Sequence, residues 1–240
     1  MFAVLCMVLA AVGSSPLSAQ NDLVTVRGEN QDDGSVILYA SSNHIIPVYI
    51  NVDLPELISM ETDARIPHGA ELAPGATDVE LFRLTPTRSS GRIGYSVSYS
   101  YARGNPFTAD HDDRFRYLIP FAHGEKRRLS QGFFGSFSHF GENEYAVDFE
   151  MPVGTEVYAA RSGIVAEVKE DSRRGGRSRS YNGDGNYILV MHEDGSFANY
   201  VHLQYGGAIV EPGDDVDEGE VIGYSGNTGR SSGPHLHFDV

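Results

Sequence analysis

The chain has 240 residues, a formal net charge of −15 and no tryptophan. This length fits one large domain or two small ones, and a hydrophobic share of 40% is sufficient for packed cores. The acidic balance argues against nucleic acid as a partner, because nucleic-acid binding needs a basic surface. After the first twenty residues no stretch is apolar for long enough to span a bilayer, so we expect no stable membrane insertion.

The N-terminus is an almost continuous apolar run over residues 1–13, followed by small residues up to Ala19. This pattern predicts a secretory signal peptide over 1–19, cleaved near Ala19, and therefore a secreted or periplasmic protein. Signal peptides usually have a basic residue in front of the apolar run, and this one has none, so a start upstream of Met1 or a buried N-terminal helix is an alternative. Cys6, the single cysteine, lacks the Leu-Ala-Gly pattern of a lipoprotein signal, so we expect no lipid anchor and no thiolate metal ligand in the mature chain.

Residues 20–122 are expected to form short strands separated by turns. No helical periodicity is evident, and 93–102 alternates with Tyr95, Val97 and Tyr99 on one face. We therefore predict a β-rich, β-sandwich-like N-terminal domain whose role the sequence does not indicate. Further strands are expected over apolar or β-branched runs at 36–39, 45–50 and 79–84.

Two polar segments lie near the middle of the chain. His111–Asp113 is expected to be a surface loop, with a calcium or second zinc site as the alternative. The charged segment 123–128 predicts the boundary between an N-terminal domain and a C-terminal domain over 123–240.

The C-terminal domain is expected to be an antiparallel β-sheet domain. Asp194-Gly195 predicts a hairpin turn, because glycine accepts a positive φ, and His192 beside it is expected to be structural. The polar segment between Lys169 and Asn186 is expected to be a solvated, mobile loop. Its alternative role is a rim that contacts carboxylates of an anionic ligand, because it carries Arg173, Arg174, Arg177 and Arg179.

His235 and His237 are two residues apart near the C-terminus. If 234–240 is a strand, both imidazoles point to one face, while Leu236 and Phe238 point into a core. Two imidazoles on one face suit a zinc site, although this pattern alone is weak evidence. The glycines between 226 and 233 fit turns rather than a phosphate-binding loop.

The sequence around these histidines resembles the lysostaphin/LytM-type zinc peptidases. Residues 225–238 resemble the C-terminal signature of that family, 200–203 its Tyr-X-His-Leu element, and 145–157 its first metal motif and the strand after it. The resemblance covers about residues 131–240, with the elements in the family's order. Members generally run on a little beyond this strand, which is consistent with a chain truncated after Val240.

This resemblance implies a role for each matching position. His139, Asp148 and His237 would bind one Zn²⁺, and three protein ligands leave the open position that a catalytic zinc site keeps for water. Many members place the first ligand where this chain has Glu144, so we assign His139, in the family's longer spacing, and keep Glu144 as the alternative. His235 would be the general base, and His202 would assist it or stabilise the oxyanion.

The implied function is a secreted zinc endopeptidase that hydrolyses cross-links or stem peptides of bacterial peptidoglycan. One alternative is an inactive relative that binds cell wall or activates another hydrolase. Another is a binding protein whose function lies in the N-terminal β domain. The sequence predicts no oligomeric state, and it assigns no role to His44, His68 or His123.

Overall fold

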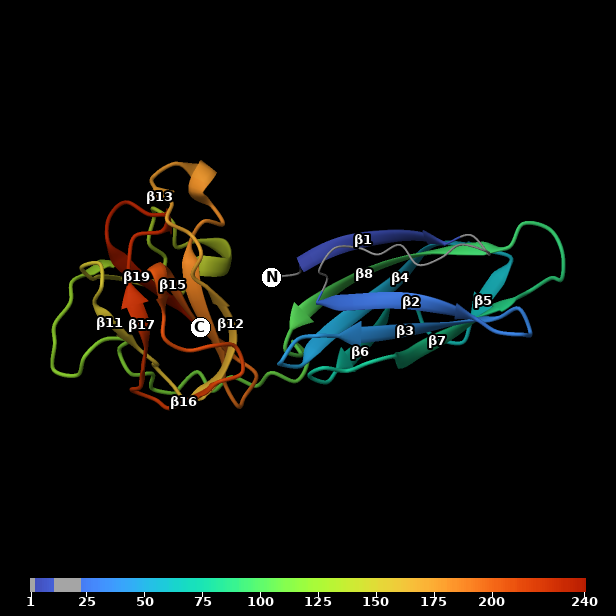
Figure 1. Ribbon diagram of the computed structural model, residues 1–240, viewed down its shortest axis with the longest axis horizontal. Helices are drawn as coiled ribbons and strands as arrows, with labels where there is room; N and C mark the ends of the chain where they lie inside the picture. The colour runs from blue at the N-terminus through green and yellow to red at the C-terminus, as the bar shows by residue number, and fades with distance from the viewer. Residues whose placement is uncertain (1–2, 11–22) are drawn as a thin grey trace. The chain divides into compact units, whose positions relative to one another are not determined.

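A computed structural model describes residues 3–10 and 23–240 of the chain (Figure 1). Within these residues the fold is all-β, as predicted, with two short 3-10 turns and no α-helix. No helix of the described residues is long and apolar enough to cross a membrane. The chain divides into two compact units, Met1–Thr108 and Ala109–Val240.

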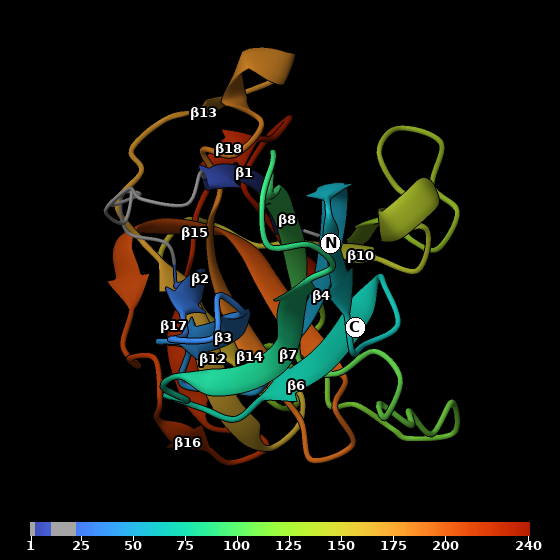
Figure 2. The same cartoon turned by 90° about the vertical axis from the view of Figure 1, so that its right-hand side faces the viewer.

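The first unit consists of two four-stranded antiparallel sheets. One sheet has the order β1-β8-β4-β6, with three of its strands visible side by side in Figure 2: Gly94–Arg103 (β8), Val48–Ile58 (β4) and His68–Leu72 (β6). The other has the order β2-β3-β7-β5: Val24–Asn30, Val36–Ser42, Val79–Pro86 and Met60–Thr62. Buried side chains from both sheets form a single hydrophobic core.

Strand β8 shows how the sequence builds this core. Val97 and Tyr99 are buried, and Tyr95 and Tyr101 pack against the same core, so the predicted alternation is observed. The hydroxyl of Tyr99 donates a hydrogen bond to the carbonyl of Val24 at 3.1 Å, and this bond joins the two sheets.

The apolar N-terminal segment is a strand over Ala3–Ala10 (β1), which pairs antiparallel with β8. The alternative of an N-terminal helix is therefore wrong for these residues. The predicted signal-peptide cleavage near Ala19 lies outside the described residues, because residues 11–22 are not described.

The two units divide at Thr108, earlier in the chain than the charged segment 123–128 that suggested a boundary. The reason is the apolar segment before it: Phe121 lies in the core of the second unit and Tyr117 packs against that core. The amide of Leu118 also donates to the carbonyl of Ala160 at 2.9 Å. Residues 109–122 thus belong with the second unit by packing.

The second unit is built on a nine-stranded antiparallel sheet whose main order is β16-β12-β14-β15-β19-β10-β9. From edge to edge these strands are Asp215–Val216, Gly163–Lys169, Asn186–Met191, Phe197–Ala208, His235–Asp239, Val147–Glu150 and Leu129–Gln131. Strand β17 (Val221–Ser225) pairs with β15 and with β11 (Glu156–Tyr158). A short parallel pair joins β13 (Gly175–Gly176) to β18 (Gly229–Arg230).

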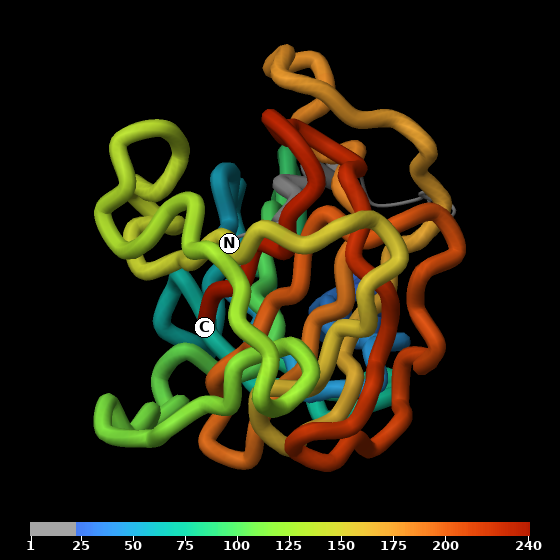
Figure 3. The backbone as a smooth tube through the Cα atoms, turned by 90° about the vertical axis from the view of Figure 1, so that its left-hand side faces the viewer, coloured from blue at the N-terminus to red at the C-terminus, as the bar shows by residue number. Residues whose placement is uncertain are grey.

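Two loops stand out from this sheet in the tube view of Figure 3. Residues 132–146, in yellow-green, connect β9 to β10 and include the 3-10 turn η1 (Gly141–Asn143). The arginine-rich segment between β12 and β14, in orange, includes the 3-10 turn η2 (Arg179–Tyr181). The expected hairpin at Asp194-Gly195 joins β14 to β15, and Gly195 has a φ of 82°.

Tyr200, on strand β15, lies in the hydrophobic core of the second unit. Its side chain is completely buried, and its hydroxyl accepts a hydrogen bond from the Ala160 amide at 2.7 Å. Burial of the hydroxyl raises the pKa of Tyr200 above its usual range. The ring also packs against Phe238 of β19, so the core supports the strand that carries the two C-terminal histidines.

We expect Tyr200→Phe to lower the free energy of unfolding by about 1–3 kcal/mol, because the buried Ala160 amide would lose its partner. Chemical denaturation followed by circular dichroism measures this. The control is Tyr145→Phe at an exposed ring, which should change stability by less than about 0.5 kcal/mol. Equal losses in the two variants would contradict the assignment.

Candidate metal centre and active-site cleft

Strands β10 and β19 place a carboxylate and an imidazole directly opposite each other. The antiparallel register pairs Asp148 with His237 and Glu150 with His235. Leu236 and Phe238 alternate with the histidines and are buried in the core. The sequence pattern of two histidines on one face and two apolar residues on the other is therefore confirmed.

His139 reaches the same place from the loop between β9 and β10. Its Nε2 lies 3.1 Å from Asp148 Oδ1, while His237 Nδ1 lies 2.8 Å from that same oxygen. The potential ligand atoms of His139, Asp148 and His237 all lie within 4.8 Å of one another, and all three residues are buried. Glu144, the alternative, is not part of this cluster.

The hydrogen bonds of the two imidazoles fit a metal ion. His139 donates its Nδ1–H to the carbonyl of Gly132 at 2.9 Å, which leaves the Nε2 lone pair facing Asp148, and this buried Nε2 has no hydrogen-bond partner. His237 has the opposite orientation, with Nε2 3.0 Å from Asp239 Oδ2 and Nδ1 facing Asp148. Metal-binding histidines commonly donate their second ring N–H in this manner.

Electrostatics also favour a cation here. Burial opposes ionisation of Asp148, but the hydrogen bond from His237 and the nearby imidazoles hold the pKa of this carboxyl below its usual range. Burial also opposes protonation of His237, but the hydrogen bonds of His237 to Asp148 and Asp239 raise its pKa to about 9. Without a metal, a proton thus lies between His237 and Asp148, where a bound cation would replace it.

A β-bulge directs His202 towards this cluster. In the pairing of β14 with β15, Tyr187 is opposite Val201 but Asn186 is opposite Leu203, so His202 is an extra residue with a φ of 69°. Without the bulge, His202 would share the core-facing side of Tyr200. Its Nδ1–H donates to the carbonyl of Thr228 at 2.7 Å, so Nε2 is the free nitrogen.

His235 lies beside His202, with ring centres 4.6 Å apart. Its Nδ1–H donates to the carbonyl of Gly233 at 2.7 Å, and its Nε2 lies 3.7 Å from Asp148 Oδ1. Burial and the neighbouring His235 lower the pKa of His202 to about 3, so His202 is a neutral imidazole near pH 7.

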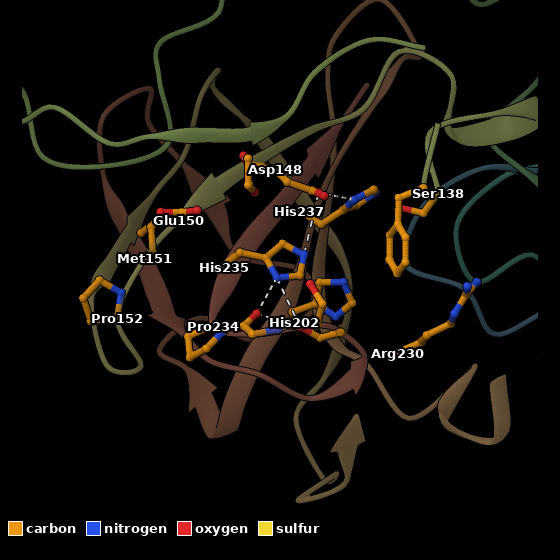
Figure 4. Close-up of a pocket in the computed structure, with 15 residues that line it drawn as sticks. Ser138, Asp148, Glu150, Met151, Pro152, His202, Arg230, Pro234, His235 and His237 are labelled. Atoms are coloured by element: carbon orange, nitrogen blue, oxygen red, sulfur yellow. Dashed lines mark hydrogen bonds and ion pairs between the residues drawn. The ribbon is translucent and has the colours of Figure 1, made fainter. Parts of the chain in front are cut away.

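These side chains lie along a cleft of about 570 Å³ (Figure 4). Asp148, His202, His235 and His237 occupy its centre in the view, and its other lining residues come from strands β9, β10 and β18 and from the loops next to them. In Figure 4, Met151 and Pro152 lie to one side of the histidines, and Ser138 and Arg230 lie to the other. Of the three potential metal ligands, Asp148 and His237 line this cleft.

Two other sequence features that contain histidine, His192 and the His111–Asp113 segment, lie outside the cleft. His192 is buried beside the β14–β15 hairpin, and its Nδ1–H donates to the carbonyl of Ser162 at 2.9 Å, as expected for a structural residue. Burial lowers the pKa of His192. His111–Asp113 is an exposed loop, and no metal-binding group is found there among the described residues.

The arginine-rich loop is exposed but held at several points. Arg173 packs over the ring of Tyr205 at 3.3 Å, and Arg174 forms an ion pair with Asp184 at 3.4 Å. The parallel pairing of β13 with β18 joins the loop backbone to the segment that lines the cleft. This loop is therefore a neighbour of the cleft wall.

Part of the second unit matches a known protein family. The family model described as peptidase family M23 matches residues 142–240. This segment belongs to peptidase family M23. His139 lies just before the matched range, whereas Asp148, His202, His235 and His237 lie within it.

Named relatives resemble the M23 segment over about 100 residues. The peptidoglycan DD-endopeptidase ShyA of Vibrio cholerae is 38% identical over 93 residues, which cover 39% of this chain and 19% of ShyA. Lysostaphin of Staphylococcus simulans is 41% identical over 100 residues, which cover 41% of this chain and 18% of lysostaphin. The match thus spans about a fifth of each of these relatives.

A solved structure gives a similar alignment. The catalytic domain of the antimicrobial peptidase lysostaphin from Staphylococcus simulans is 38% identical, and the alignment covers 47% of this chain and 77% of that one. The TM-score is 0.34, so the family assignment rests on the sequence match.

Two residues around the M23 site were not identified from the sequence. Gln131 donates from Nε2 to Asp148 Oδ2 at 3.0 Å, and Asp239 accepts from His237. Asp239 could have been found, because it lies two residues after His237 on the same face of the strand. Gln131 gave no such signal, because its contact depends on the pairing of β9 with β10.

Two glycines of the C-terminal signature, Gly226 and Gly233, differ in the space around their Cα atoms. A Cβ on Gly226 would lie 2.3 Å from the Gln204 amide nitrogen, whereas a Cβ on Gly233 would meet nothing within 4 Å. We expect Gly226→Ala to lower the free energy of unfolding by about 1–3 kcal/mol, because two backbones must move apart. Gly233→Ala should be nearly neutral. Thermal unfolding compares the two variants, and similar melting temperatures would contradict the close approach.

Proposed function

We propose that this protein is a zinc-dependent endopeptidase that hydrolyses peptide bonds in bacterial peptidoglycan. The observation that carries the proposal is that the potential ligand atoms of His139, Asp148 and His237 all lie within 4.8 Å of one another. Asp148 and His237 line a cleft together with His202 and His235. The names of the relatives ShyA and lysostaphin give the substrate class.

We assign His139, Asp148 and His237 as the ligands of one zinc ion. A zinc ion supplies Lewis-acid chemistry when bound, because it makes water a stronger nucleophile and polarises the carbonyl of the substrate. Gln131 and Asp239 would orient two of these ligands through their hydrogen bonds.

We assign His235 as the general base. Its Nδ1–H is held by the carbonyl of Gly233, so its Nε2 lone pair faces Asp148 and can accept a proton from the attacking water. His202 presents its Nε2 to the same cleft, because its Nδ1–H is held by Thr228. It can assist His235 or, once protonated, donate a hydrogen bond to the oxyanion of the substrate.

The alternative is a relative without activity that binds wall or activates another hydrolase. Such a role needs neither a complete ligand set nor free imidazole nitrogens. This chain has both, and they lie together, so catalysis is the better supported function. Secretion is part of the proposal, and it rests on the apolar run and small residues before Ala19.

We expect the zinc-loaded protein to release soluble peptides from purified peptidoglycan, and a chelator to abolish the release. His235→Ala should retain zinc but lose about 10²–10⁴-fold in rate, because it removes the general base. Chromatography of the released fragments measures this, with His123→Ala at an exposed histidine as the control. Equal rates for wild type and His235→Ala would exclude this mechanism, and stimulation of another hydrolase without release would favour the alternative.

Metal content separates the ligands from the other histidines. We expect Asp148→Ala to lose zinc, because it removes the oxygen that both His139 and His237 approach. His202→Ala should keep zinc and lose turnover. Asp239→Asn should weaken zinc affinity by about 10–100-fold through the orientation of His237. Competition with a chromogenic chelator measures these affinities, and full zinc occupancy in Asp148→Ala would refute the ligand assignment.

A further inference from the structure

Arg230 is a positive charge without a counter-charge in the wall of the cleft. It ends strand β18, it is half-buried, and it lines the cleft with the histidines. Its Nε is buried and has no hydrogen-bond partner. No carboxylate of the described residues forms an ion pair with it. A buried donor without a partner is costly, which points to a partner that the protein alone does not supply.

The surroundings hold the guanidinium in place. Its Cζ lies 5.6 Å from the centre of the Phe137 ring, which also lines the cleft. Phe137 is two residues from His139, and Arg230 precedes Ser231, whose Oγ lies 3.2 Å from His235 Nδ1. The guanidinium therefore lies between the loop that carries His139, a proposed ligand, and the segment that leads into His235, the proposed base.

The cleft contains one other charged side chain outside the histidine cluster, Glu150. Its carboxylate is 2.9 Å from the guanidinium of Arg128, so its charge is already paired. The unpaired charge that a peptide meets beside the metal ligands is thus that of Arg230.

We propose that Arg230 binds a carboxylate of the peptide substrate close to the scissile bond. Arginine matches a carboxylate through two parallel N–H···O bonds, and such charge-assisted bonds are stronger than neutral ones. This inference rests on the proposed function, and it adds a preference among peptide substrates. The preferred substrate carries a free carboxylate next to the bond that is cut, rather than an uncharged residue such as glycine or an amidated acid.

The test compares two peptides that differ only in a carboxylate or a carboxamide on the residue next to the scissile bond. Wild type should cleave the acid peptide with the higher kcat/KM. Arg230→Gln should lose about 10–100-fold on the acid peptide, mostly in KM, and little on the amide peptide. Arg230→Lys should recover part of the loss. Arg116→Gln at an exposed arginine outside the cleft should behave as wild type.

A binding measurement keeps this test independent of turnover. Fluorescently labelled acid and amide peptides are titrated with zinc-loaded full-length His235→Ala, with and without Arg230→Gln, and fluorescence anisotropy is recorded. A preference for the acid peptide that Arg230→Gln removes supports the proposal, even if wild type cleaves neither peptide and the proposed function fails. Equal weakening for both peptides would show that Arg230 only shapes the wall. Cleavage of both peptides without an Arg230-dependent preference would overturn this inference and leave the proposed function intact.

Discussion

The pairing of β10 with β19 is the constraint on which the site depends. Its register places Asp148 opposite His237, and Asp148 Oδ1 is the point that His139, His235 and His237 all approach. A shift of one residue would turn both C-terminal histidines into the core and Leu236 outward. The burial of Leu236 and Phe238 fixes this register, so the same strand pairing determines both the hydrophobic core and the candidate metal site.

Much of this arrangement could be predicted from local sequence. The all-β fold, the alternation of β8 and the two faces of β19 follow from the period-two pattern of apolar residues. The hairpin at Asp194-Gly195 follows from turn chemistry. These features depend on residues that are close together in the chain, so they can be predicted from the sequence alone.

The features that could not be derived locally depend on contacts between distant segments. Strict alternation would place His202 beside Tyr200 in the core, and only the bulge against β14 turns it to the cleft. The resemblance indicated the role of His202 but gave no physical reason for its direction. The boundary near 123 followed the charged residues, whereas the packing of Phe121 and Tyr117 decides where the second unit begins.

Three histidines of the candidate site are oriented by main-chain carbonyls, those of Gly132, Thr228 and Gly233. Every residue type has a carbonyl, so the tautomers of His139, His202 and His235 do not depend on which side chains stand at those three positions. Sequence drift there can remodel the rim of the cleft while the proton positions on the imidazoles stay the same. Substitutions at the rim of the cleft can thus change what the cleft binds while the proposed catalytic histidines keep their tautomers.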